Sequence, residues 1–385
     1  MSGAAPVTDP ALEVLPATMR AALFVGGGRP LELAEVGLPA PGRGEILVRV
    51  VACGLCHTDL HYLDHGVPTF KPPPLVLGHE VSGIVAATGP GTDPDLVGSA
   101  VLLAPVTTCG ACIPCRTGRE NVCAQQRMLG NSMDGGYAEY VVAPARDAFP
   151  IPPEVPLEEA CVVADALTTA FHAVVRRACV APGESVAVYG CGGLGLSVVQ
   201  VAAMLGAHVV AVDLDPRKLA LALDLGAAAS VDAREGDVTK RVRQAAAGGA
   251  DVAIEAIGRP STQEQAVASL RTGGRAVFLG SSAEPMTLPG GRVMYRELSV
   301  IGTLGCRPVD FPVVLDLVRR GKLRVSPLVT HRHPLERINE GLDLLRRGEG
   351  IRHIVVLDDD GTGMKERTEE RTLRAAAAAK LTRPA

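Results

Sequence analysis

Four cysteines within fifteen residues form the part of the sequence best suited to chemistry. They are Cys109, Cys112, Cys115 and Cys123, in the spacing C-x2-C-x2-C-x7-C. Thiolates at this spacing, with glycine and proline between them, can surround one tetrahedral Zn²⁺. Because four protein ligands close the coordination shell, we expect a structural metal site. The spacing also permits an iron–sulfur cluster, and disulfides would require an oxidising compartment.

A second set of metal-binding residue types is spread along the chain. Cys56 lies in C-G-L-C-H-T-D-L-H at residues 53–61, His79 lies in G-H-E at residues 78–80, and Asp165 lies in A-D-A-L-T-T. Taken singly, each is typical of a structural residue: a buried cysteine, a hydrogen-bonded histidine or a helix-capping aspartate. Their joint presence ahead of a nucleotide-binding pattern favours a shared site.

That nucleotide-binding pattern begins with an apolar run followed by Gly190, Gly192 and Gly195 in the spacing G-x-G-x-x-G. An amphipathic stretch and a second apolar run ending in Asp213 come next. This order predicts strand, tight turn, helix and strand, with the helix N-terminus facing a pyrophosphate. A carboxylate at Asp213 accepts ribose hydroxyls and repels a 2′-phosphate, so we expect NAD. Arg217 is the nearby residue that could accept NADP.

The elements that must position these residues fall into a β-rich first part and an alternating second part. Strands are predicted at 19–24 and 45–52, an irregular β-rich segment continues to about residue 150, and an Ala-rich helical stretch covers 157–179. Alternating strands and helices then predict a parallel sheet with right-handed crossovers. The further predicted strands are 229–232, 251–257, 275–280, 298–302 and 351–357, and the predicted helices are 218–225, 238–247, 262–270, 311–320 and 335–347. We expect the last of these elements to return to the first part.

Composition sets limits on the class of protein. With 385 residues, 47% apolar and 21% charged, the chain has the composition of a globular protein of two domains. Its net charge of −4 provides no basic surface for nucleic acid, and no apolar run is long enough to cross a membrane. The first 18 residues lack the features of a signal peptide, so we expect a cytoplasmic protein with no membrane partner.

Together, the two groups of metal-binding residues, the glycine pattern and the Ile351-Arg352 pair resemble the zinc-dependent medium-chain alcohol dehydrogenases of the medium-chain dehydrogenase/reductase superfamily. The resemblance covers roughly residues 19–358. It implies an α/β protein with a GroES-like β-rich catalytic domain, a Rossmann domain with a doubly wound parallel sheet, and a cleft between them. The expected division is an N-terminal extension at 1–18, a GroES-like domain at 19–168 and 307–358, a Rossmann NAD-binding domain at 169–306 and a C-terminal tail at 359–385.

The resemblance implies two Zn²⁺ per subunit. Cys56, His79 and Asp165 would bind the catalytic ion, with Glu80 as an alternative ligand and one position left for water or substrate. Many members of the family have cysteine where this chain has Asp165. The structural ion would be held by Cys109, Cys112, Cys115 and Cys123.

The resemblance also assigns the residues that move a proton and bind the cofactor. Thr58 resembles the proton acceptor and His61 the end of the relay, while Asp59 would orient the imidazole of His79. Lys218 resembles a second ribose contact. The implied cofactor-binding residues are His57, Thr169, Gly190, Gly192, Gly193, Leu194, Gly195, Asp213, Lys218 and Arg352.

We therefore expect an NAD-dependent alcohol dehydrogenase that forms an aldehyde or a ketone. A polyol dehydrogenase, a zinc-free NAD(P)-binding reductase and a non-catalytic relative are the alternatives. We expect a substrate larger than ethanol because the chain has no Trp and places Ala104 where the family often has a large ring. Tyr62, Met128 or Met294 could refill that space. A homotetramer is favoured over a dimer. Cys53, Cys161, Cys179, Cys191 and Cys306 are expected to be packing residues, and His172 and His208 structural ones.

Overall fold

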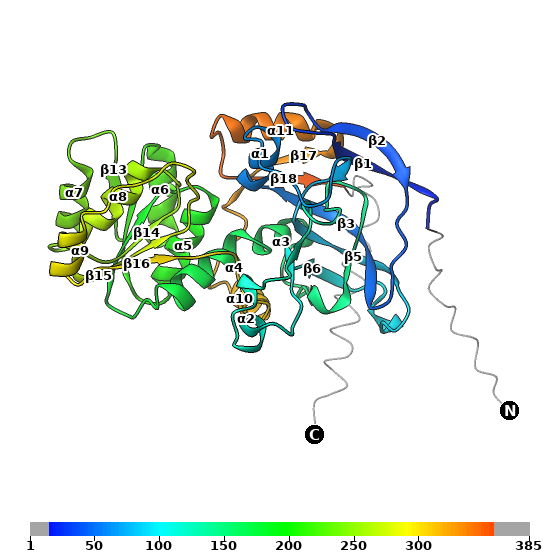
Figure 1. Ribbon diagram of the computed structural model, residues 1–385, viewed down its shortest axis with the longest axis horizontal. Helices are drawn as coiled ribbons and strands as arrows, with labels where there is room; N and C mark the ends of the chain where they lie inside the picture. Colours follow the sequence, from blue (N-terminus) through cyan, green and yellow to red (C-terminus); the bar gives the residue numbers. More distant parts are fainter. Residues whose placement is uncertain (1–14, 358–385) are drawn as a thin grey trace, which may run out of the picture.

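The computed structural model describes residues 15–357. Two bodies, each built around its own sheet, lie side by side along the long axis of the molecule (Figure 1). Most of the predicted N-terminal extension and the whole predicted tail at 359–385 lie outside the described residues.

The first body contains a seven-stranded sheet with the order β10-β6-β5-β3-β18-β17, in which β9 also pairs with β3. Strand β3 is central because its sequence, E-I-L-V-R-V-V-A-C-G-L, is apolar on both faces and nearly all of it is buried. The strands are β3 (Glu45–Leu55), β5 (Glu80–Thr88), β6 (Ala100–Leu103), β9 (Tyr140–Pro144), β10 (Ala148–Pro150), β17 (Val329–Pro334) and β18 (Arg352–Val356).

Smaller elements complete this body. A three-stranded sheet has the order β2-β1-β4, and β7 pairs with β8 beside the cysteine loop. These strands are β1 (Thr18–Phe24), β2 (Glu32–Gly37), β4 (Leu75–Val76), β7 (Val106–Thr107) and β8 (Arg127–Met128). The helices and turns are α1 (His57–Leu63), η1 (Pro94–Leu96), α2 (Ile113–Arg116), η2 (Glu120–Val122), η3 (Ala145–Asp147), η6 (Leu335–Arg337) and α11 (Ile338–Arg346).

The second body is built on a six-stranded sheet with the order β13-β12-β11-β14-β15-β16, in which all neighbours are parallel. Numbered along the chain, this order is 3-2-1-4-5-6, the arrangement of doubly wound dinucleotide-binding sheets. The strands are β11 (Ser185–Tyr189), β12 (His208–Asp213), β13 (Ala229–Asp232), β14 (Ala250–Glu255), β15 (Leu270–Phe278) and β16 (Ser299–Gly302), and the helices are α5 (Gly193–Met204), α6 (Pro216–Asp224), α7 (Val238–Ala245), α8 (Pro260–Ser269) and α9 (Gly290–Tyr295). Helix α10 (Asp310–Arg319) instead contacts β10 of the first body. The predicted fold class is confirmed.

The end of the described chain returns to the first body, as expected. β18 pairs antiparallel with β3, and β17 pairs parallel with β18. Strand β17 was not predicted from the sequence, because V-T-H-R-H-P lacks an apolar run and ends in proline. Such a sequence is tolerated at the edge of a sheet, which is where β17 lies. The exact domain boundaries proposed from the sequence stay predictions.

The predicted helical stretch over 157–179 is not one continuous helix. It divides into α3 (Leu157–Ala160), the 3₁₀ turn η4 (Cys161–Val163), α4 (Ala166–Phe171) and the π-helical turn η5 (His172–Arg177). The break falls at Asp165, whose φ of −124° and ψ of −59° are not helical. The amino-acid composition of this segment did not reveal the break, because the sequence is rich in alanine on both sides of it.

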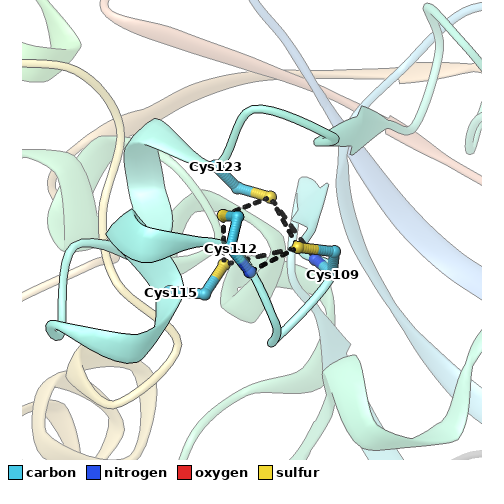
Figure 2. Close-up of side chains that lie close together, drawn as sticks. All are labelled: Cys109, Cys112, Cys115 and Cys123. Carbon is cyan, nitrogen blue, oxygen red and sulfur yellow. Dashed lines mark hydrogen bonds between the residues drawn. The ribbon is translucent and has the colours of Figure 1, made fainter.

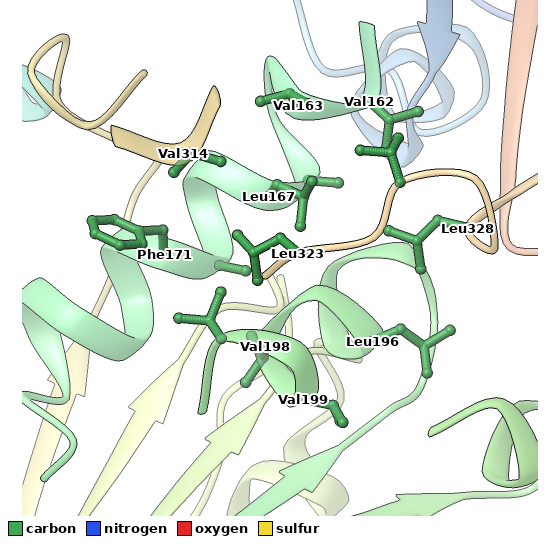
Figure 3. Close-up of a cluster of buried hydrophobic side chains, with 14 of the residues drawn as sticks. Val162, Val163, Leu167, Phe171, Leu196, Val198, Val199, Val314, Leu323 and Leu328 are labelled. Atoms are coloured by element: carbon green, nitrogen blue, oxygen red, sulfur yellow. The ribbon is translucent and has the colours of Figure 1, made fainter. Parts of the chain in front are cut away.

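One hydrophobic core joins the two bodies. It includes Val162 and Leu167 from the segment between them, Leu196 from α5, and Leu323 and Leu328 from the connection before β17. Figure 3 shows these side chains converging from separate elements. Because the same cluster also contains Leu102 of β6 and Val188 of β11, the core fixes the two sheets relative to each other.

Candidate active site

Three elements bring Cys56, His79 and Asp165 together. Cys56 follows β3 and caps α1, His79 directly precedes β5, and Asp165 precedes α4. Asp165 Oδ2 lies 3.8 Å from Cys56 Sγ and 4.0 Å from His79 Nε2. Together with Glu80, these residues offer ligand atoms that all lie within 4.8 Å of one another. Residues separated by 109 positions in the sequence are therefore neighbours in space.

The chemistry of this donor set fits a divalent cation. Burial opposes protonation of His79, yet the Cys56 thiolate and the Asp59 and Asp165 carboxylates raise its pKa to about 10. The cluster thus attracts positive charge at a place that is almost closed to solvent, since His79 is 3% exposed. One sulfur, one imidazole nitrogen and one carboxylate oxygen, with a position left open, is a donor set of the catalytic zinc type.

Asp59 supports this cluster mainly through Cys56. Its Oδ2 accepts hydrogen bonds from the Cys56 backbone N–H at 3.0 Å and from the Tyr137 hydroxyl at 2.7 Å. Its Oδ1 lies 3.9 Å from His79 Nδ1, longer than a hydrogen bond, and has no other partner. Tyr137 was missed from the sequence because nothing in G-G-Y distinguishes it from an ordinary core tyrosine.

Glu80 is held beside the cluster by an ion pair with Arg352. Both side chains are buried, and Arg352 is supplied by β18 from the far end of the chain. Glu80 Oε2 has no hydrogen-bond partner. A Cβ on Gly54 would lie 2.1 Å from this oxygen, so glycine at that position makes room for the carboxylate.

The predicted relay residues lie on one helix. Thr58 and His61 are both in α1, three residues apart, which places them on the same helix face. Thr58 Oγ1 lies 3.5 Å from Cys56 Sγ and faces the catalytic cavity. His61 Nδ1 lies 3.0 Å from His65 Nδ1, so His65 extends the row of imidazoles toward solvent. His65 was not predicted as a site residue, because it lies outside the C-H-T-D-L-H segment.

A cavity of about 240 Å³ opens above the cluster. Its polar floor is formed by Thr58, His79, Asp165 and Thr169. The remaining wall is largely apolar and includes Pro105, Val106, Met128, Leu304, Cys306, Pro308 and Phe311. A small polar floor under an apolar wall is typical of a site for a small, mainly apolar molecule.

The expectation that Ala104 opens this pocket is wrong. Ala104 is 3% exposed and packs in the core, whereas the next two residues line the cavity. Tyr62 is buried outside the cavity, where its hydroxyl accepts a hydrogen bond from Asn131. Met294 is 74% exposed on α9, and only Met128 of the residues considered as space-fillers lines the cavity.

The predicted nucleotide site has the expected backbone. Gly190 has a φ of +92°, and a Cβ on Gly195 would lie 1.7 Å from the Gly190 carbonyl oxygen. Gly192 caps α5 without a side chain, so the first N–H groups of that helix, beginning with Gly193 and Leu194, are open to phosphate. A Cβ on Gly193 would lie 2.2 Å from Arg352 Cδ, which places that arginine beside the loop.

Asp213 ends β12 with its carboxylate oriented by backbone groups. Its two oxygens accept hydrogen bonds from the N–H groups of Cys191 and Asp215, at 2.6 Å and 2.9 Å. Arg217, the candidate NADP contact, is instead paired with Asp215 at 2.8 Å. Lys218 Nζ lies 3.3 Å from the Gly348 carbonyl oxygen.

Two further predicted cofactor contacts, Thr169 and His57, differ in burial. Thr169 donates a hydrogen bond to Asp165 Oδ1 at 2.6 Å, so it orients the third ligand and also lines the catalytic cavity. His57 is exposed at the start of α1.

The four cysteines of the loop at 109–123 converge as predicted (Figure 2). Sulfur–sulfur distances are 3.4 Å for Cys112–Cys115, 3.5 Å for Cys109–Cys123, 3.8 Å for Cys112–Cys123 and 3.9 Å for Cys109–Cys115. A tetrahedron with Zn–S bonds of ~2.3 Å has edges of about 3.8 Å, so the thiols fit this ion. Hydrogen bonds from the N–H groups of Ala111 and Cys112 lower the pKa of Cys109 to about 6, which favours the thiolate.

Of the other cysteines, Cys53, Cys161 and Cys191 are buried packing residues, as expected. That expectation is wrong for Cys179, which is exposed, whereas Cys306 packs against the core and also lines the catalytic cavity. His172 is buried near Asp310, and His208 lies on the surface with Nε2 3.1 Å from the Ala245 carbonyl oxygen.

The fold and both cysteine-containing sites define a zinc-binding dehydrogenase. The family model described as "Alcohol dehydrogenase GroES-like domain" matches residues 42–153, and the model described as "Zinc-binding dehydrogenase" matches residues 193–320. The chain belongs to the zinc-dependent medium-chain dehydrogenase family. It is an oxidoreductase of the alcohol dehydrogenase type, and its cofactors are zinc and a nicotinamide dinucleotide.

Particular relatives support this assignment. The chain is 36% identical to an alcohol dehydrogenase of Geobacillus stearothermophilus over 344 residues, which cover 89% of this chain and 100% of that protein. A solved NAD-dependent alcohol dehydrogenase superposes with a TM-score of 0.83 at 34% identity, over 88% of this chain and 100% of that one. A zinc-binding dehydrogenase of Sinorhizobium meliloti, solved with NADP, has a TM-score of 0.82 at 32% identity, over 89% and 100% of the two chains.

Within residues 15–357, no helix has the length and apolar character needed to cross a bilayer.

Proposed function

We propose that this protein oxidises a primary or secondary alcohol larger than ethanol to the aldehyde or ketone, with NAD⁺ as hydride acceptor and two Zn²⁺ per chain. The observation that carries the proposal is the convergence of Cys56, His79 and Asp165 at a point where His79 and Asp165 line a largely apolar cavity. When bound there, Zn²⁺ supplies Lewis-acid catalysis by lowering the pKa of the alcohol oxygen.

The chain's own residues supply orientation and proton transfer. Thr58 lines the cavity on the same face of α1 as His61, so the Thr58 hydroxyl accepts the substrate proton as it releases its own toward His61, which passes a proton to solvent. His65 Nδ1, 3.0 Å from His61 Nδ1, continues this path. Thr169 and Asp59 hold Asp165 and Cys56 in place through hydrogen bonds.

NAD is preferred over NADP in this proposal. The Asp213 carboxylate is fixed by two backbone N–H groups at the end of β12, where it repels a 2′-phosphate. Arg217 is already paired with Asp215 and so is less available to a phosphate. Values of kcat/KM measured with NAD⁺ and NADP⁺ test this preference, and equal values would contradict it.

The size of the substrate is inferred from the cavity wall. Each methylene buried against Pro105, Val106 and Phe311 contributes about 0.8 kcal/mol, so four extra carbons favour 1-hexanol over ethanol by up to ~3 kcal/mol, or about 100-fold. A comparison of kcat/KM for ethanol, 1-hexanol, benzyl alcohol and cyclohexanol is the test. Ethanol turned over as efficiently as the other three would refute the larger-substrate proposal.

We also propose that the protein is a homo-oligomer, with a tetramer favoured. Large apolar side chains are exposed on α9 and the edge strand β16, among them Met294, Tyr295 and Val300. Such groups gain free energy when a second copy covers them. Light scattering coupled to size-exclusion chromatography gives the number of subunits, and a monomer would refute this assignment.

A further inference from the structure

A second cavity, of about 540 Å³, adjoins the catalytic cavity. It lies between the cysteine loop, the turn η5 and the segment that follows β16. Asn121 and Leu304 line both cavities, and Asn121 Nδ2 donates a hydrogen bond to the Leu304 carbonyl oxygen at 2.9 Å. The two cavities therefore share a wall.

The second cavity is strongly cationic. Its lining includes Arg119, Arg176, Arg177 and Arg307. Among its lining residues, all of which lie in the described part of the chain, there is no Asp or Glu. Glu120, although next to one of these arginines, does not line the cavity.

One buried carboxylate, Asp310, balances only part of this charge. It accepts hydrogen bonds from Arg176 Nε and Nη2 at 3.1 Å and 3.0 Å, and Arg307 Nη2 lies 3.4 Å from it. Arg177 donates to a backbone carbonyl, that of Gly302, and so keeps its charge uncompensated. Within residues 15–357, the side chain of Arg119 has no hydrogen bond or ion pair at all.

Polar groups in the wall also lack partners. Thr303 Oγ1 is buried and forms no hydrogen bond, although the residue lines the cavity. His172, which is 3% exposed, has no hydrogen bond at Nδ1 and lies 3.6 Å from Asp310 through that atom. A hydroxyl donor beside several guanidinium groups is a good environment for the oxygens of an anion.

We propose that this cavity binds an oxyanion, either a carboxylate or a phosphate, carried at the far end of the alcohol substrate. The inference deepens the proposed function and rests on it, because only the hydrogen-bonded pair Asn121 and Leu304 separates the far end of a molecule in the catalytic cavity from the arginines. In the alternative, a free oxyanion occupies the cationic cavity while a neutral alcohol occupies the catalytic cavity.

The test uses the zinc-loaded enzyme and a series of ω-hydroxyalkyl carboxylates and monophosphates of increasing chain length. Each is compared with the neutral 1-alkanol of equal carbon number, and the measured quantity is the ratio of their kcat/KM values. We expect the ratio to exceed one at chain lengths that reach the arginines. Arg119→Gln should lower it about tenfold, because a hydrogen bond to a charged group is lost. Arg116→Gln removes the same charge from the same loop, outside the cavity, and should leave the ratio unchanged.

Inorganic phosphate distinguishes the two sources of the anion. If the substrate carries it, phosphate should raise KM for the charged substrates and not for the neutral alcohols. If phosphate instead changes the kinetics of neutral alcohols, and Arg119→Gln removes that effect, the cavity binds a free anion. Ratios of one at every length, with no effect of phosphate, overturn the inference while leaving alcohol oxidation intact. If no alcohol is oxidised, the proposed function fails, and calorimetric titration with phosphate then decides whether the cavity binds anions.

Discussion

Asp165 divides its two carboxylate oxygens between different tasks. Oδ1 accepts the hydrogen bond from Thr169, which fixes the side chain, while Oδ2 lies near Cys56 Sγ and His79 Nε2. The interruption between η4 and α4 makes this possible, because a residue with helical φ and ψ at position 165 would carry the carboxylate elsewhere. The local backbone break is therefore part of the site.

Asp165→Asn should remove catalytic activity and leave the cysteine loop intact. An amide is a poorer ligand than a carboxylate, so we expect one Zn²⁺ fewer per chain and a fall in kcat/KM of at least about 100-fold. Elemental analysis and steady-state kinetics measure the two effects. Asp343→Asn, on the exposed face of α11, is the control. Full zinc content with normal activity would show that Asp165 is not a ligand.

Tyr137→Phe tests how much the hydrogen bond from Tyr137 to Asp59 contributes to the free energy of unfolding. Tyr137 donates to the buried carboxylate of Asp59, and its loss leaves that oxygen with the Cys56 N–H alone. We expect the free energy of unfolding to fall by about 1–3 kcal/mol. Tyr62→Phe removes a hydrogen bond between neutral groups, with Asn131, and should cost about 0.5–1.5 kcal/mol. Urea unfolding of both variants gives the comparison, and equal losses would argue against a special role of the charged acceptor.

At the scale of single elements, the cysteine loop at 109–123 has little regular secondary structure to hold its shape without a metal ion. Its regular structure consists of α2 and η2, which together contain only seven residues. Cys112→Ser should lower the free energy of unfolding by about 3 kcal/mol or more, because a closed thiolate site contributes folding energy. Cys179→Ser, at an exposed cysteine, is the matched control. Unchanged thermal stability with a selective loss of kcat would contradict a structural role.

Strand β18 supplies Arg352, the oppositely charged partner of the buried Glu80 side chain. Arg352→Met leaves that carboxylate buried without its partner, which should destabilise the protein by about 3–5 kcal/mol. The double variant Glu80→Gln/Arg352→Met removes both charges and should recover part of this loss. Thermal unfolding of Arg352→Met, Glu80→Gln and the double variant gives a double-mutant cycle, which measures the interaction energy of the pair. Additive effects of the two single substitutions would show that the pair does not interact.

Elements with strong local signals could be predicted, and those fixed by distant contacts could not. The turn from Gly190 to Gly195 and the spacing of the cysteines each carry their own constraint, and the structure forms a tight turn at the first and a compact cluster of sulfurs at the second. The break at Asp165 and the strand β17 depend on residues far away in the sequence. Likewise, the burial of Ala104 depends on its packing in the hydrophobic core, which the residues next to it in the sequence do not predict.

For the whole molecule, the shared hydrophobic core is what places the chemistry between two sheets. Leu167 and Phe171 of α4 pack with Val198 of α5 and Val314 of α10 (Figure 3). The same helix α4 begins beside Asp165 and contains Thr169. The metal cluster and the nucleotide loop are thus fixed to one packed unit, which limits the distance between alcohol and cofactor.

The pairing of β18 with β3 has a consequence for how the protein is made on the ribosome. Residues 45–55 leave the exit tunnel about three hundred residues before their partner strand at 352–356. Until then, residues 52–55 of β3 lack their β18 partner and expose unpaired backbone groups on that side, and Glu80 has no guanidinium beside it. The nascent first body is therefore open to association with other chains during most of translation, and its final closure waits for the last strand.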